Sequence, residues 1–79
     1  MVTKLAPRIV ADPKIQFGRP VVEGTRVDVG TILRHLSAGW NLETVAREFA
    51  LTREDILAAV AYAANVMSNQ RYTDDRSDG

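Results

Sequence analysis

The side chains that most often carry out catalysis are sparse in this chain of 79 residues, which contains one histidine and no cysteine. The histidine, His35, precedes Ser37 by two positions, and on a helix such a pair does not face one direction as a base and its nucleophile would. Glu54 and Asp55 are adjacent, and no third metal ligand lies near them in the sequence. We therefore expect no enzymatic activity, no metal and no cofactor, and a structural or solvated role for His35.

Arginine and threonine side chains near one predicted turn have the chemistry needed to contact DNA. Thr52 can reach a phosphate, and Arg53 can reach a phosphate or a guanine edge. Glu54 and Asp55 follow them and would repel a DNA backbone, so the alternative is an acidic turn that only complements the helix dipole. The predicted DNA contacts are Arg19, Arg26, Arg47, Thr52 and Arg53.

The charge balance bears on this hypothesis in two ways. Ten basic and ten acidic residues give a net charge of zero, whereas nucleic-acid-binding proteins usually carry a basic excess. The N-terminal β region, residues 8–29, does have a slight basic excess. Its cations either contact phosphates or an acidic partner, or are ordinary solvated charges. They are Arg8, Lys14, Arg19 and Arg26.

The C-terminal residues 71–79 differ in composition from the rest of the chain. They are polar and without hydrophobic periodicity, which predicts a flexible tail. Tyr72 is an isolated aromatic residue there, and aromatic residues often anchor interfaces. An acidic tail also suits the basic cleft of a ribonuclease. We predict that the segment from about Met67 to Gly79 binds a partner, and the alternative is a solubilising tail or a cloning remnant. Its predicted contacts are Met67, Arg71, Tyr72, Asp74 and Asp75.

Length and composition predict one small domain over residues 1–70. A chain of this size buries only about 60% of its unfolded surface, so it is marginally stable alone. We expect a homodimer, in which exposed strand edges between Ile9 and Val29 pair across two chains. No apolar run approaches the ~20 residues of a membrane span, and Met1 to Pro7 lacks the apolar region of a signal peptide. The expected location is the cytoplasm.

The spacing of apolar residues predicts three helices within residues 29–69. Asp28, Asn41 and Thr52 are suited to cap their N-termini, and Asp55 completes a capping box with Thr52. Gly39 suits the end of the first helix. The predicted apolar faces are Val29, Ile32, Leu33 and Leu36, then Val45, Ala46 and Phe49, then Ile56, Val60, Ala63 and Met67.

The second and third predicted helices have the outline of a helix-turn-helix. Ala46 is small enough to let the two helices approach, and Ile56 is placed to anchor the third helix on the second. Ala50 lies in the turn, where glycine is more usual because positive φ is often required. We expect Trp40 in the core between the first two helices; the alternative is an interface anchor.

Residues 8–29 are predicted to form a small β-element, while Met1 to Pro7 frays. Ile15 and Phe17 alternate with polar residues, which is typical of a half-buried strand. Two β-branched runs flank Glu23-Gly24 and predict a β-hairpin. The predicted fold class is therefore mainly α, with three helices after a small N-terminal β-element.

The run from Asp12 to Ala63 resembles the family called domain of unknown function 433. The resemblance rests on Asp12-Pro13, Gly18-Arg19-Pro20-Val21-Val22, Gly24-Thr25-Arg26-Val27, Leu51-Thr52 and Glu54-Asp55-Ile56. It implies a homeodomain-like helix-turn-helix and a place in type II toxin–antitoxin operons, commonly beside a PIN-like ribonuclease toxin. One departure is Phe49-Ala50, where the family often has a Tyr-Pro-like turn.

The resemblance leads us to expect a dimeric antitoxin. Its folded part would bind operator DNA, and its C-terminal tail would neutralise a PIN-like ribonuclease toxin. One alternative is a DNA-binding regulator without a toxin. Another is a protein-interaction module that uses the helix-turn-helix only as a scaffold, which the zero net charge favours.

Overall fold

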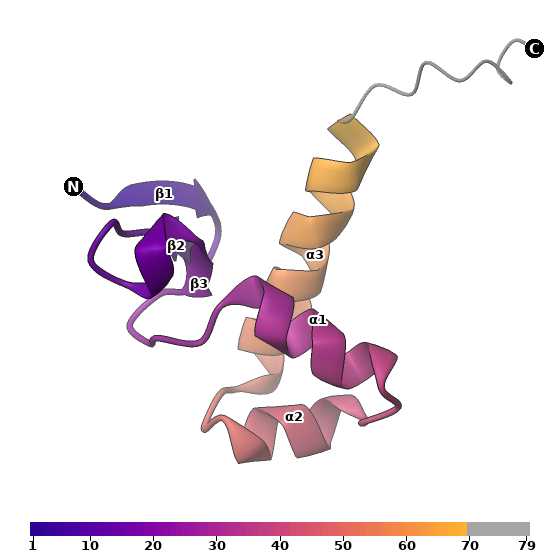
Figure 1. The fold of residues 1–79 in the computed structure, drawn as a ribbon. Helices are drawn as coiled ribbons and strands as arrows, with labels where there is room; N and C mark the ends of the chain where they lie inside the picture. The colour runs from indigo at the N-terminus through magenta and orange to yellow at the C-terminus, as the bar shows by residue number, and fades with distance from the viewer. Residues whose placement is uncertain (70–79) are drawn as a thin grey trace, which may run out of the picture.

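Three helices and a small antiparallel sheet make up residues 1–69, the part of the chain that the computed structural model describes (Figure 1). The helices are α1 (Val29–Ser37), α2 (Leu42–Glu48) and α3 (Arg53–Asn69). The strands are β1 (Thr3–Ala6), β2 (Ile9–Ala11) and β3 (Pro20–Val22), in the order β1-β2-β3, and a short 3-10 helix, η1 (Gln16–Gly18), precedes β3. The predicted fold class is confirmed.

The core lies where the three helices meet one another and the sheet. Ile9 and Val22 enter it from β2 and β3, Ile32 from α1, Val45 from α2 and Ile56 from α3, each at most 1% exposed. Burying one such side chain stabilises the fold by roughly 1.5–3 kcal/mol. The predicted anchoring role of Ile56 is therefore confirmed, and residues from both halves of the chain share one core.

The N-termini of α2 and α3 have the side-chain caps that the sequence predicts, and that of α1 does not. The Asn41 side chain accepts a hydrogen bond from the Thr44 amide at 2.8 Å. Thr52 and Asp55 form a capping box, because each side chain accepts the other's backbone N–H, at 3.1 and 3.0 Å. Asp28 occupies the cap position of α1, but its carboxylate accepts from the Thr31 hydroxyl rather than from a backbone amide.

The C-termini of α1 and α2 share one backbone motif. The residue after each C-cap has positive φ, 102° at Gly39 and 56° at Ala50. The next amide reaches back over the last turn: Leu51 N–H donates to the Ala46 carbonyl at 2.8 Å, and Trp40 N–H makes the equivalent bond in α1. Both ends are Schellman motifs, which usually place glycine at the positive φ. The predicted backbone requirement at Ala50 is confirmed.

The sequence prediction was wrong at two places before β3. Thr3–Ala6 is not a frayed end but β1, which pairs with β2 through an irregularity between Lys4 and Ala6. The segment around Ile15 and Phe17 is not a strand but leads into η1. The turn at Asp12-Pro13 continues there, because Ile15 N–H donates to the Asp12 carbonyl at 2.9 Å, and the chain bends instead of extending.

Only the first strand of the predicted hairpin forms. β3 enters a turn in which Gly24 has a φ of 83°, but the return segment makes one isolated bridge, between Val21 and Asp28. The Thr25 hydroxyl donates to the Val22 carbonyl and accepts from Val27 N–H, at 2.8 and 3.0 Å. The Thr25 side chain therefore satisfies backbone hydrogen-bonding groups that would have paired between the two strands of a longer hairpin.

The prediction that Trp40 lies in the core was also wrong. It follows the turn at Gly39, and the residue remains 37% exposed. Its ring packs edge-on against the imidazole of His35, with centroids 4.6 Å apart. His35 also packs against Phe49, and its Nδ1 lies 2.8 Å from the Thr31 carbonyl oxygen. His35 therefore contributes to packing at the edge of α1.

α3 runs from the end occupied by α2 to the far end of the molecule (Figure 1). Within residues 1–69, no helix combines the length and the apolar composition that a membrane span needs. Val60, predicted on the buried face of α3, is partly exposed, because the helix packs on the core mainly through Ile56 and Ala59. The predicted tail, 71–79, lies outside the described residues.

Candidate functional site

The three predicted DNA contacts of the helix-turn-helix are all exposed, but two of them already have partners. The Thr52 hydroxyl belongs to the capping box with Asp55. The Arg53 guanidinium lies 2.6 Å from a carboxylate oxygen of Glu43. Arg47, on the last turn of α2, makes no ion pair within residues 1–69. Arg47 is therefore the cation of this group that is available to an anionic ligand without breaking such a pair.

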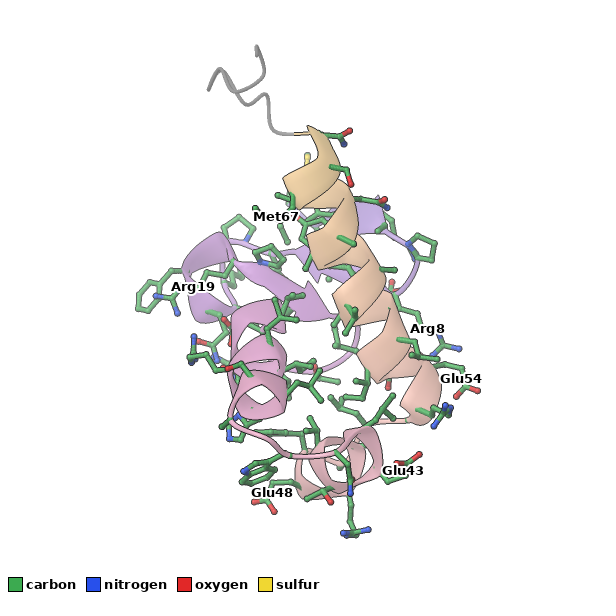
Figure 2. The ribbon with its side chains drawn as sticks, turned by 90° about the vertical axis from the view of Figure 1, so that its right-hand side faces the viewer. Arg8, Arg19, Glu43, Glu48, Glu54 and Met67 are labelled. Carbon is green, nitrogen blue, oxygen red and sulfur yellow. The ribbon has the colours of Figure 1, made fainter. Side chains whose placement is uncertain are left out.

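Carboxylates surround this end of the molecule. Figure 2 shows Glu43 and Glu48 on α2 and Glu54 at the start of α3. Their charges oppose the approach of a phosphate backbone. Among residues 1–69, acidic and histidine side chains do not gather in a group of three that could hold a metal ion. The start of α3 is thus an acidic, capped helix end.

Asp55 joins this helix end to the sheet. A carboxylate oxygen of Asp55 accepts from the Arg8 guanidinium at 3.0 Å, and Arg8 lies in the turn between β1 and β2. Burial alone would raise the pKa of Asp55, but the hydrogen bonds from Thr52 and Arg8, with the charge of Arg8, lower it below its ordinary value. Asp55 is therefore ionised at neutral pH and serves the fold.

Arg19 and Arg26 belong to a different surface from Arg53. Figure 2 shows Arg19 at the opposite edge of the molecule from Glu43, the ion-pair partner of Arg53. The Arg26 carbonyl accepts from the Gln16 side chain at 2.9 Å, which places Arg26 beside η1. The structure therefore divides the predicted DNA contacts between the helix-turn-helix and the loops that flank β3.

An apolar groove of about 340 Å³ lies between α1, the start of β3 and the second half of α3. Met67, a predicted partner contact, lines this groove and is 53% exposed. The other predicted partner contacts, Arg71, Tyr72, Asp74 and Asp75, lie outside the described residues. Pro20, Val29, Leu33, Tyr62 and Val66 also line the groove. Sequence reasoning missed it because its walls come from three separate elements.

α3 itself carries a signal that could have led to the groove. Residues 56–69 contain no charged side chain. In the second half of the helix, Val66 is 38% exposed and Met67 is 53% exposed. A helix that is apolar on every side is normally covered on every side, and a contiguous exposed apolar patch often marks an interaction site. The second half of α3 is therefore the strongest candidate for a protein-binding surface.

Comparison with known proteins matches most of the chain to one family. A family model described as "Protein of unknown function (DUF433)" matches residues 9–63. The chain is also similar to the X-ray crystal structure of Rv2018 from Mycobacterium tuberculosis, with 33% sequence identity and a TM-score of 0.62. That similarity covers 66% of this chain and 24% of Rv2018, so the chain matches about a quarter of the longer protein. No curated protein matches the chain.

Proposed function

We propose that this chain, which belongs to the DUF433 family, is the antitoxin of a type II toxin–antitoxin pair and neutralises a PIN-like ribonuclease. The observation that carries the proposal is the apolar groove between α1 and α3. Val66 and Met67, near the end of α3, line this groove, and residues 70–79 come next in the sequence, so we expect one partner to contact both. The groove would take an apolar segment of the toxin, while Asp74 and Asp75 would reach its basic RNA-binding cleft.

The composition of the groove supports a protein ligand. Its lining is almost entirely apolar, and grooves of this kind accept the apolar face of a helix or segment. Tyr62 and Met67 supply an aromatic and a flexible thioether side chain, both of which are common in interface cores. A partner that binds the groove would hold residues 70–79 at a high effective concentration for its second contact.

Co-expression with the adjacent open reading frame tests this proposal. The neighbouring product should copurify with this chain, and its ribonuclease activity should be suppressed. Met67→Asp places a charge in the groove and should abolish both copurification and suppression. Leu57→Asp is the matched control, because Leu57 is an exposed apolar residue of the same helix that does not line the groove. Capture unaffected by Met67→Asp would rule out the groove as the binding surface.

Removing residues 71–79 tests the predicted tail separately. The melting temperature should remain almost unchanged, because the core and the residues packed against it lie within residues 6–63. Capture of the neighbouring product should be lost, and its nuclease activity should return. A truncated chain that still binds and inhibits the partner as well as the full chain does would show that the tail assignment is wrong and that the interface lies on the helices or the β-region.

Operator binding is the second function that we propose, and the exposed cation of Arg47 favours it. With few phosphate contacts, binding should be weak and the slope of log affinity against log salt shallow. Arg47→Ala should weaken binding to DNA from upstream of the gene, and Arg53→Ala should do so by about 1–3 kcal/mol if Arg53 reads a base. Equal affinity for upstream and scrambled DNA at every salt concentration would favour the scaffold alternative.

A further inference from the structure

Phe17 is an aromatic residue that the fold holds in solvent. The residue is 91% exposed. Its φ is 57°, and that of Gln16 is 49°, a region that is unfavourable for residues with a Cβ. The loop thus carries backbone strain and gains little from burying the ring. Strain of this kind is retained most often where it positions a functional side chain.

The loop that presents Phe17 is held by hydrogen bonds on both sides. Gly18 N–H donates to the Ile15 carbonyl, and Arg19 N–H donates to the Gln16 carbonyl, each at 3.0 Å. The Gln16 side chain also donates to the Arg26 carbonyl, which ties η1 to the loop after β3. A ring on such a loop is preorganised, so little conformational entropy is lost when it binds.

Cations accompany the ring. The Arg19 guanidinium carbon lies 5.9 Å from the centroid of Phe17, within the range of a cation–π contact. Lys14, Arg19 and Arg26 are exposed, and none of them takes part in an ion pair within residues 1–69. Arg19 also projects at the opposite edge of the molecule from Glu54 (Figure 2). Arg19 therefore lies on a different side from the acidic start of α3.

The acidic residues of the same segment offset these cations only in part: Asp12 keeps its charge, Asp28 is buried, and Glu23 has its own ion-pair partner. Asp12 accepts from the Lys14 backbone amide at 2.9 Å. Glu23 pairs with Lys4 at 3.0 Å. The exposed charge beside Phe17 is therefore mainly positive, and it suits a ligand that carries negative charge.

We propose that Phe17, with Arg19, Lys14 and Arg26, forms a nucleic-acid contact. A base face stacks on the Phe17 ring, and the cations bind the adjacent phosphates. A nucleic acid fits better than a protein, because the chain neighbours of the ring are polar residues and glycine rather than the apolar surround of an interface hot spot. This contact rests on the nucleic-acid part of the proposed function and is independent of the toxin.

Fluorescence anisotropy with three labelled probes tests the contact. The probes are a duplex from upstream of the gene, a scrambled duplex of equal length and composition, and the single strand of the first. Phe17→Asn removes the ring and keeps a residue that tolerates positive φ, so the melting temperature should not fall. Its Kd for at least one probe should rise about tenfold, the loss typical of one stacked base. Arg19→Gln should weaken binding and reduce the salt slope by about one.

Leu57→Asn is the matched control, because Leu57 is an exposed apolar residue outside this loop, and its Kd should equal that of the wild type. If Phe17→Asn loses more affinity for the single strand than for the duplexes, the ring stacks on an unpaired base. If it loses more affinity for the duplexes, the ring contacts a groove. Equal losses on upstream and scrambled duplexes would support this contact even if operator preference were absent.

Two outcomes would overturn the proposal. One is that the wild-type chain binds none of the three probes. The other is that Phe17→Asn leaves the Kd for every probe unchanged. This includes the case in which the variant weakens capture of the neighbouring gene product but not binding of nucleic acid. In that last case the loop is a protein contact, while operator binding through Arg47 would still be open to its own test.

Discussion

Ala50 and Gly39 occupy the same backbone position at the ends of two helices, and only one of them is a glycine. Ala50 has a φ of 56°, where a Cβ is unfavourable, and Gly39 has a φ of 102°. We expect Ala50→Gly to raise the free energy of unfolding by up to about 1 kcal/mol, and Gly39→Ala to lower it by about as much or more. A Cβ at Gly39 would meet nothing within 4 Å, so no steric clash adds to the backbone strain there.

Urea denaturation of the wild type and both variants measures these changes in the free energy of unfolding. Changes of opposite sign, with equal m-values, are the expected result. A destabilised Ala50→Gly variant would mean that the lost methyl group or the added freedom of the unfolded chain outweighs the relief of strain.

Asp55 makes stability depend on pH at the acidic end of the scale. Burial raises the pKa of Asp55, but the hydrogen bonds from Thr52 and Arg8 outweigh it and hold that pKa below the ordinary value of an aspartate. The carboxylate therefore contributes stability that is fully present above the unfolded pKa, and this contribution is lost as the pH falls through the folded pKa. Asp55→Asn keeps an acceptor oxygen for the cap but removes the charge that pairs with Arg8, so it should lower the free energy of unfolding near pH 7 by up to about 1 kcal/mol.

The difference between wild type and Asp55→Asn should be constant from about pH 7 to pH 5 and should shrink below about pH 4, where the wild-type carboxylate takes up its proton. Urea denaturation of both proteins at several pH values measures this difference in the free energy of unfolding. Asp12→Asn is a control, since its carboxylate accepts from a local backbone amide and not from the cap or Arg8. A pH-independent difference would show that the charge of Asp55 is not what stabilises the folded state.

At the scale of elements, α3 is held by a short stretch of its length. Ile56 and Ala59 are fully buried, while Leu57, one residue after Ile56, is 46% exposed. We expect Ile56→Ala to cost about 2–5 kcal/mol, because it removes core contacts and leaves a cavity. For a domain of this size that loss is a large part of the total stability.

Thermal unfolding followed by circular dichroism, with Leu57→Ala as the matched control, measures this loss. The control should melt within a few degrees of the wild type, and Ile56→Ala should melt far below it or be unfolded. Similar melting temperatures for the two variants would mean that α3 is held mainly by contacts outside this core.

At the scale of the whole molecule, the sheet leaves one edge open. The outer edge of β1 has no strand partner within residues 1–69, whereas β3 is partly covered by the bridge between Val21 and Asp28. We predict a homodimer, and β1 rather than the segment from Ile9 to Val29 now offers the edge for pairing. The uncharged half of α3 is a second surface that a partner could cover.

Sedimentation at micromolar concentration should give the mass of a dimer. Leu5→Pro should shift the equilibrium toward monomer if β1 forms the interface, because proline cannot donate a hydrogen bond to a neighbouring strand. Val2→Pro, just outside β1, is the control. A monomer with a cooperative melt would show that the small core is sufficient without a second chain.

Local sequence determined the helices and their ends. Asn41, Thr52 and Asp55 cap as predicted, because a cap involves groups within about three residues of each other. Gly39 and Ala50 end their helices for the same local reason. The fold class and the family followed from these patterns and from the motif run between Asp12 and Ala63.

Tertiary structure alone decided what depends on partners distant in the chain. β1 became a strand because β2 pairs with it, and the segment at Phe17 turned outward because the chain bends after Asp12. The apolar groove exists because three elements converge, and the division of the predicted DNA contacts follows from where those elements lie. Strand pairing, and the set of side chains that share one surface, depend on contacts between residues that are distant in the sequence. Local propensity and spacing therefore do not determine them.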